Sequence, residues 1–184
     1  MWNVRHWGTT AEEGARPFPC DRWMPEPDEA FHRGVSVAAA PEAVFRWLCQ
    51  LRAAPYSYDW IDNWGRASPQ SLTPELDRLA VGQRFMTIFE LVEFEPERQL
   101  TLRMLSGGLS ERLFGNLLVT YLVVPHEAGS RLLAKLVLRY PPGAWGRVLR
   151  RLLPAGDLVM MRRQLLNLKR LAENLEDFEG RDRA

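Results

Sequence analysis

The acids best placed for chemistry lie in one aromatic segment, YSYDWIDNWG, at residues 56–65. Asp59, Asp62 and Asn63 stand among tryptophans there. A carboxyl group pressed against indole rings has a raised pKa and can act as a general acid or base near neutral pH. The same residues also have a structural explanation, which we favour. Asp59 is a good helix N-cap, and Asp62 falls in the first turn, where the helix dipole favours an acid.

Aromatic and methionine side chains in this segment and in later strands can line a cavity for an apolar molecule. The residues assigned to such a site are Tyr56, Tyr58, Trp60, Phe89, Met104 and Tyr121. Arg103 is a candidate anchor for a ligand carboxylate, since an inward guanidinium can bind it through two hydrogen bonds. The alternatives are that several of these side chains fill the core and that Arg103 faces solvent. A one-residue error in strand register would exchange the two faces of the sheet.

Other catalytic motifs are absent from the sequence. It contains no nucleophile elbow, phosphate loop, dinucleotide fingerprint or HExxH pair. The histidines and cysteines are scattered, at His6, His32, His126, Cys20 and Cys49. Their spacing matches neither a zinc site nor a CxxC redox pair, so we predict no metal and no cofactor. So few cysteines are typical of a reducing cytoplasm, with one disulfide left open as an alternative.

The elements that hold the candidate residues begin with a strand joined directly to a helix. Valines alternate with small residues over 34–39. Pro41 then occupies the first turn of a helix that runs to Leu51 with one apolar stripe. A second short helix is expected at 59–65.

A long β region begins at Gln83. The segment RFMTIFELVEF (84–94) is rich in aromatic and β-branched residues and is predicted as one strand. Another strand is expected at 99–105, followed by irregular chain through Phe114 and a hairpin that turns at Gly129. Six or seven antiparallel strands are expected in all.

The last predicted element is a long amphipathic helix. Leucines recur at steps of three and four from Ala144 to Leu175. Pro154 lacks a backbone N–H and is expected to bend or interrupt this helix.

Composition and charge narrow the class of protein. A chain of 184 residues that is 46% hydrophobic suits a single domain with an ordinary core. The net charge of +1 argues against nucleic-acid binding. The longest apolar runs, 117–124 and 132–138, are far shorter than the ~20 residues of a membrane-spanning helix. The first residues lack the pattern of a signal peptide. We therefore expect a soluble, cytoplasmic protein.

One region is strongly basic. Between Arg139 and Arg170 lie eight basic residues and one acid, Asp157, a local balance of +7. The simpler explanation is a solvated helix face. The alternative is a surface that makes peripheral contact with an anionic membrane or an acidic partner.

Several of these segments together resemble the START-like, helix-grip superfamily, also described as SRPBCC or polyketide cyclase/dehydrase and lipid-transport proteins. The segments are GVSVAAAPEAVFRWLCQL, LTPELDRLAVGQRF, FELVEFEPERQLTLRM and the final helix, and YSYDWIDN is similar to an uncharacterised bacterial branch. The resemblance implies an α+β helix-grip fold, in which a curved antiparallel sheet of six or seven strands wraps around a long C-terminal helix. It also implies an internal apolar cavity.

The expected organisation is a single START-like domain at 31–176. Residues 1–30 contain three tryptophans, which are costly to leave in water, so they form an arm packed on the domain. Residues 177–184 form a frayed tail.

The leading hypothesis for function is binding or carriage of an apolar small molecule, such as a lipid, fatty acid or polyketide-like compound. One alternative is a cyclase, dehydratase or hydrolase that uses the same cavity, with Asp59 or Asp62 as base. A second is a membrane-surface or partner-binding module that acts through the basic C-terminal helix. The sequence predicts no oligomeric state.

Overall fold

The computed structural model describes residues 3–58, 65–127 and 129–182, with side chains as far as Leu175. The strands are β1 (His6–Trp7), β2 (Glu29–Val37), β3 (Arg84–Phe85), β4 (Phe89–Glu95), β5 (Gln99–Met104), β6 (Asn116–His126) and β7 (Gly129–Arg139). The helices are α1 (Ala11–Ala15), α2 (Pro19–Trp23), α3 (Pro41–Cys49), the short η1 (Gln50–Arg52), α5 (Leu109–Phe114) and α6 (Gly143–Asp182).

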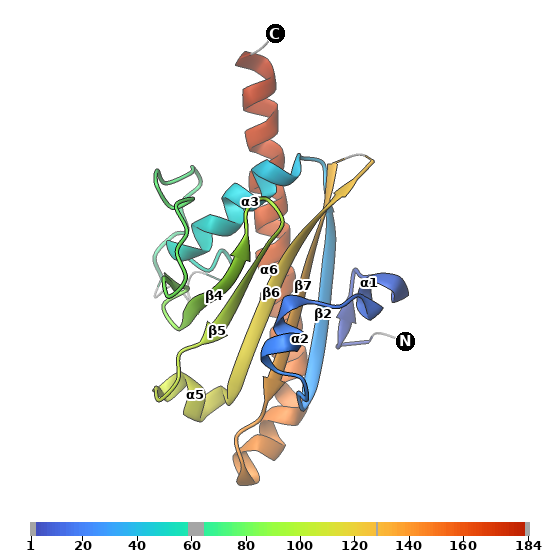
Figure 1. The fold of residues 1–184 in the computed structure, drawn as a ribbon, viewed down its shortest axis with the longest axis vertical. Coiled ribbons are helices and arrows are strands. Elements are labelled where there is room, and N and C mark those ends of the chain that lie inside the picture. Colours follow the sequence, from blue (N-terminus) through green and yellow to red (C-terminus); the bar gives the residue numbers. More distant parts are fainter. Residues whose placement is uncertain (1–2, 59–64, 128, 183–184) are drawn as a thin grey trace.

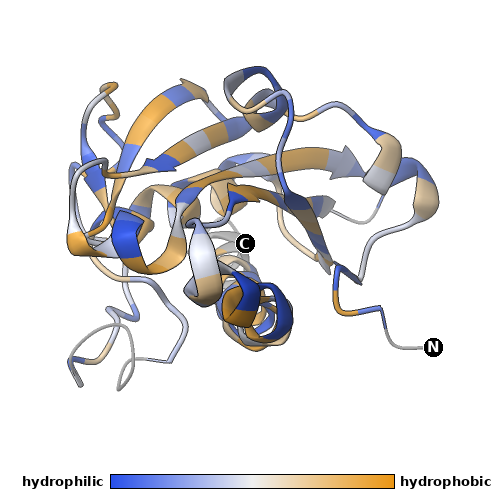
Figure 2. Ribbon diagram, turned by 90° about the horizontal axis from the view of Figure 1, so that it is seen from below, coloured by the Kyte–Doolittle hydropathy of each residue, from blue (hydrophilic) through white to orange (hydrophobic). Residues whose placement is uncertain are grey.

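The strands form one curved sheet, and α6 runs along its inner face (Figure 1). The strand order is β1-β2-β7-β6-β5-β4-β3, so the prediction of six or seven strands is confirmed, with seven observed. All neighbouring pairs are antiparallel except β1 and β2, which are parallel. Seen from below, α6 lies end-on beneath the sheet (Figure 2). This arrangement is the α+β helix-grip architecture that the sequence predicts.

The alternation of side chains along each strand builds two cores. On the inner face, Phe31 and Val37 of β2 belong to one cluster with Leu165 and Leu168 of α6. Each such buried side chain contributes about 1.5–3 kcal/mol relative to an exposed one. The stripe of α3 packs into the same cluster through Leu48. The concave face of the sheet, α3 and α6 therefore share one apolar interior.

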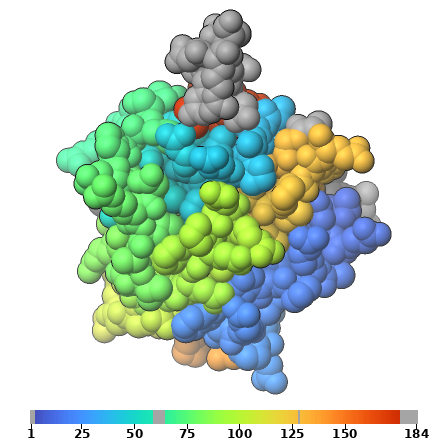
Figure 3. Space-filling view, turned by 45° about the horizontal axis from the view of Figure 1, so that its top comes forward, coloured from blue at the N-terminus to red at the C-terminus, as the bar shows by residue number. Residues whose placement is uncertain are grey.

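The N-terminal segment covers part of the outer face. Cys20 of α2 and its neighbours Phe18 and Met24 form a second core with side chains of β6 and β7. The backbone N–H of Cys20 also donates to Thr120 Oγ1, at 3.0 Å. Figure 3 shows this segment, in blue, lying against the strands. Cys20 and Cys49 are both buried free thiols.

The long strand predicted at 84–94 is divided, and that prediction is wrong. The chain reverses between β3 and β4, where Met86 and Thr87 have φ of 44° and 67°. The Met86 N–H donates to the Leu51 carbonyl instead of a strand partner, at 2.9 Å. Side-chain propensity indicated a strand but could not reveal this hydrogen bond to a distant element.

Two further predictions about regular structure need correction. The irregular piece expected before Phe114 contains the helix α5. In addition, α6 is not interrupted at Pro154, and interruption was one of the two outcomes expected there. A proline inside a helix costs about 3 kcal/mol, but Leu149 and Leu165, which lie on either side of Pro154, are buried in the same inner core and offset that cost. The second helix expected at 59–65 falls mainly on residues outside the described ranges.

Within the described residues, no helix combines the length and the apolar character needed to cross a bilayer.

Candidate functional site

A buried ion pair ties β2 to α6 inside the apolar interior. The Arg33 Nη2 lies 2.6 Å from Asp157 Oδ2, and the two side chains are 1% and 6% exposed. Arg33 also donates to the carbonyls of His32 and Val4, at 3.0 and 2.9 Å. Burial raises the pKa of Asp157 to about 6, although the guanidinium acts in the opposite direction. Because the N–H groups of Arg33 are hydrogen-bonded to Asp157 and to two backbone carbonyls, we assign this pair a structural role.

A second buried polar pair joins β6 to α6. The Tyr121 hydroxyl donates to Gln164 Oε1, at 2.5 Å. The Gln164 amide donates in turn to the Pro55 carbonyl, at 2.7 Å, and lies 3.4 Å from Met86 Sδ. Burial raises the pKa of Tyr121, and the charge of Asp157 adds to this effect. The hydroxyl therefore stays protonated and acts as a hydrogen-bond donor.

Backbone strain is concentrated where this pair meets the loops. Tyr56, Met86 and Thr87 have φ of 55°, 44° and 67°, a region that costs a residue other than glycine roughly 1–2 kcal/mol. Helix α6 holds the first of these segments in place, because Asn167 Nδ2 donates to the Tyr56 carbonyl at 2.9 Å. Such strain persists only where the surroundings impose it, and it is frequent at ligand-binding sites.

Next to this strained segment lies a buried donor with no acceptor. Trp47 of α3 is 2% exposed, and its ring meets that of Tyr56 edge-on, with centroids 5.9 Å apart. Among the described residues, no atom accepts a hydrogen bond from Trp47 Nε1. Leaving a buried donor unpaired costs about 1–3 kcal/mol. An acceptor atom brought by a ligand would remove that cost.

These features define one candidate site between α3, the inner face of the sheet and α6. We call it the inner site and define it by Trp47, Tyr56, Met86, Tyr121 and Gln164. Its centre is tightly packed, since Trp47, Tyr56 and Tyr121 are each no more than 2% exposed. Met86 is only partly buried and stands at its rim. The predicted internal cavity is therefore closed around these residues.

The structure brings together four of the residues predicted from the sequence. Tyr56, Phe89, Met104 and Tyr121 all belong to the inner core, with Phe89 partly buried at its margin. Tyr58 is partly buried and outside this core, and the Arg163 guanidinium stands 5.9 Å from its ring centroid.

Arg103 is not part of this group. It lies on the outer face, where its Nη2 is 2.5 Å from Glu90 Oε1 and its guanidinium stands over the ring of Trp23. The cause is the register, because Leu102 and Met104 on either side of Arg103 face inward. The remaining candidates, Asp59, Trp60 and Asp62, lie outside the described residues.

Four buried residues of the interior were not among the residues predicted for the site, although the sequence pattern contains features that indicate three of them. Asp157 is the only acid in a long basic stretch, and it falls on the apolar stripe of α6, as does Gln164. Arg33 lies two residues after Phe31 in β2, so both side chains are on the inward face of the strand. A charged residue at an apolar position of the pattern indicates a buried partner. Trp47 lies beside the apolar stripe of α3, and a tryptophan there is also what an ordinary core position shows.

Comparison with known proteins shows similarity in fold and not in sequence. No protein-family model matches the sequence, and no curated protein matches it significantly. A hypothetical protein from Helicobacter pylori aligns with 85% of this chain and 95% of its own, with a TM-score of 0.54 and 16% identity.

Two other bacterial structures are similar to the same degree. A protein from Mesorhizobium loti covers 79% of this chain and 98% of its own, with a TM-score of 0.51 and 17% identity. One from Chromobacterium violaceum covers 82% and 99%, with a TM-score of 0.51 and 15% identity. The chain has the START-like, helix-grip fold. The START-like resemblance of the sequence is thereby confirmed at the level of fold.

Proposed function

We propose that this START-like chain binds an apolar small molecule with one polar, hydrogen-bond-accepting end at the inner site. The observation that carries the proposal is the buried N–H of Trp47, which has no acceptor among the described residues. The START-like fold is consistent with the binding of small apolar ligands. Lipids, fatty acids and polyketide-like compounds all have the required chemistry, a hydrocarbon body and a carbonyl or carboxyl group.

The apolar body of the ligand would supply most of the affinity. Removing apolar surface from water contributes about 25 cal/mol per Å², and the side chains that define the inner site are, apart from Gln164, aromatic or sulfur-containing. Methionine adapts to irregular shapes because its side chain is unbranched and flexible. Met86 at the rim and Met104 in the core therefore suit a ligand whose outline differs from the packed interior.

Binding requires the inner site to open, and the strained segments provide a route. Gln164 holds both the Pro55 carbonyl and Met86 Sδ. If the ligand displaces this amide, Tyr56 and Met86 can leave the left-handed region, and the relief of strain offsets part of the cost of opening. The polar end of the ligand would then accept from Trp47 Nε1, while the hydrocarbon body lies along the inner face.

The enzymatic alternative stays a prediction, because it depends on Asp59 and Asp62, which lie outside the described residues. Among the described residues of the interior, Asp157 is held by Arg33 and Tyr121 remains protonated.

The proposal can be tested by titration with two fluorescent probes, a fatty acid with a free carboxylate and the hydrocarbon diphenylhexatriene. Wild-type protein is expected to bind both saturably. Trp47→Phe removes the unpaired donor, so the affinity for the fatty acid should fall roughly tenfold, the equivalent of one hydrogen bond to a charged group. The affinity for diphenylhexatriene should change far less.

The matched control is Arg103→Gln, which removes the predicted carboxylate anchor from the outer face. It should leave the binding of both probes unchanged, and a melting curve for each variant would establish that it is folded. Failure of the wild-type protein to bind either probe would contradict the proposal. A loss of fatty-acid affinity in Arg103→Gln with none in Trp47→Phe would move the polar contact to the outer face.

A further inference from the structure

Large apolar side chains are exposed on two neighbouring helices at one end of the molecule. On α6, Trp145, Val148 and Leu152 are 47%, 43% and 63% exposed and follow one another at steps of three and four, so they form one stripe. On α5, Leu109 and Leu113 are 71% and 39% exposed and lie one turn apart. This stripe of α6 is separate from the face that the helix buries against the sheet.

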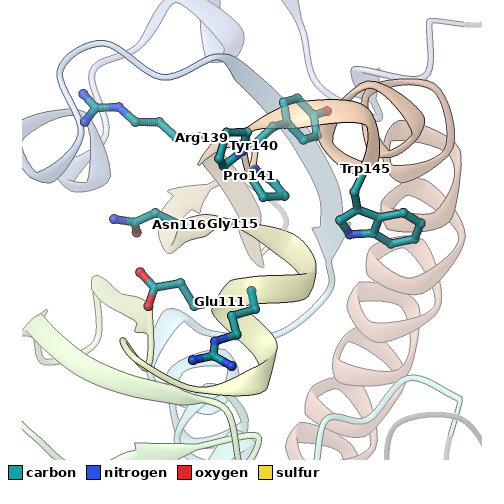
Figure 4. Close-up of a pocket in the computed structure, with 9 residues that line it drawn as sticks. Glu111, Gly115, Asn116, Arg139, Tyr140, Pro141 and Trp145 are labelled. Atoms are coloured by element: carbon teal, nitrogen blue, oxygen red, sulfur yellow. The ribbon is translucent and has the colours of Figure 1, made fainter.

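The exposed residues of the two helices form one surface. Trp145 Nε1 donates to the Leu113 carbonyl, at 2.7 Å, which fixes the start of α6 against α5. Between the helices runs an open groove of about 540 Å³, lined by Tyr140, Pro141 and Trp145 among others. Figure 4 shows Trp145 on one side of the groove and Glu111 of α5 on the other. Because its N–H is already bonded, the exposed indole presents mainly apolar surface.

The charge around this surface is mainly positive. Residues 139–156 contain four arginines and no acid, and of these Arg150 is paired with Asp28, at 2.9 Å. Glu111, the acid at the groove, accepts a hydrogen bond from the Gly107 N–H, at 2.5 Å. Three exposed arginines make no ion pair with any described residue: Arg112, Arg147 and Arg151.

We propose that this surface docks on a membrane that contains anionic phospholipid. We call it the α5–α6 patch and define it by Leu109, Arg112, Leu113, Trp145, Arg147, Val148, Arg151 and Leu152. Exposed leucine and tryptophan side chains enter the boundary between headgroups and acyl chains, where their apolar surface leaves water. The unpaired arginines meet the lipid phosphates, and salt screens that attraction. The proposal is independent of the inner site.

An anionic bilayer suits the patch better than an acidic protein does. The apolar stripe and the arginines lie along the same helix, and a bilayer surface satisfies both at once without a shaped counterpart. The groove beside Trp145 is open, and its lining includes Arg112, which can meet a phosphate-bearing headgroup. A purely electrostatic partner would leave Leu109 and Leu152 in water.

Sedimentation with vesicles tests this proposal. The full chain is mixed with vesicles of phosphatidylcholine, with and without phosphatidylserine, at low and high salt. Binding is expected only with phosphatidylserine and should weaken at high salt. Leu152→Glu and Arg151→Glu should each reduce binding roughly tenfold or more.

The chain offers closely matched controls in the loop before β3. Val81 is 65% exposed, much like Leu152, and Arg78 is also largely exposed. Val81→Glu and Arg78→Glu introduce the same charge changes and should leave vesicle binding as in the wild type. Melting curves of all four variants would show that they are folded.

Four results would overturn the proposal. The first is no sedimentation with phosphatidylserine vesicles at low salt. The second is equal loss of binding in the patch variants and the controls. The third is retention of binding in Leu152→Glu with loss in Arg151→Glu, which would indicate an acidic macromolecule as the partner. A concentration-dependent dimer without vesicles that Leu152→Glu abolishes would instead assign the patch to a second copy of the chain.

Discussion

At the scale of single residues, the interior of this protein contains two kinds of buried polar group. Arg33 and Asp157 satisfy each other, and Arg33 uses its other N–H groups on backbone carbonyls. The Trp47 N–H has no hydrogen-bond acceptor among the described residues. The first kind stabilises a fixed contact between β2 and α6. The second is the property expected of a group that meets a ligand.

Removing one partner of the Arg33–Asp157 pair should destabilise the fold strongly, whereas replacing both partners by apolar residues should destabilise it little. Asp157→Asn leaves a buried guanidinium without its counter-charge, so the free energy of unfolding should fall by about 3–5 kcal/mol. The double variant Arg33→Met, Asp157→Leu removes both charges and should lie much closer to the wild type, because neither desolvation penalty remains. Urea denaturation measures all three proteins. A double variant that is less stable than Asp157→Asn would contradict this account of the pair.

At the scale of elements, α6 is the part of the chain on which both proposed sites depend. One face of the helix carries Asp157 and Gln164 into the interior. The stripe that begins at Trp145 remains exposed. The start of the helix is fixed by a close approach, because a Cβ added at Gly146 would lie 1.9 Å from the Pro141 carbonyl oxygen. A Cβ added at Gly156 would meet no atom within 4 Å.

Two glycine substitutions in the same helix should therefore have opposite effects. Alanine is favoured over glycine in a helix by about 1 kcal/mol, so Gly156→Ala should raise the free energy of unfolding by about that amount. Gly146→Ala should lower it, because the backbone at Pro141 must shift. Thermal and urea denaturation of the two variants would check the signs. Stabilisation by Gly146→Ala would show that α6 does not approach Pro141 this closely.

The sequence predicted the elements better than it predicted their interruptions. Alternation and three-to-four spacing located the strands β2, β5, β6 and β7 and the closing helix, because these patterns depend on neighbours along the chain. The break at Met86 depends on a hydrogen bond to Leu51. The unbroken course of α6 through Pro154 depends on packing against the sheet. Contacts between distant segments leave little trace in local composition.

The candidate site was predictable only in part, for the same reason. Tyr56, Met104 and Tyr121 could be identified because aromatic and methionine side chains favour the interior. The side of the sheet on which Arg103 lies depends on strand register, because a shift of one residue moves every side chain of the strand to the opposite face. The unpaired state of Trp47 could not be predicted at all, since it depends on which of the described residues surround the indole in the folded chain, and none of them offers an acceptor.

At the scale of the whole molecule, the N-terminal segment, the sheet and α6 form three layers, and the two proposed sites lie at different places in them. The N-terminal segment covers part of the outer face of the sheet, and α6 closes the inner face (Figure 2). The inner site lies where α3 meets α6, and the α5–α6 patch lies at the start of α6. Ligand binding and membrane docking can therefore be changed by separate substitutions.

The most direct test of the central claim is native mass spectrometry of gently purified protein, before and after addition of a long-chain fatty acid. The account predicts one bound molecule per chain, released on denaturation and held less tightly by Trp47→Phe. It would be contradicted if the wild-type protein carried no molecule as purified and also failed to retain the added fatty acid.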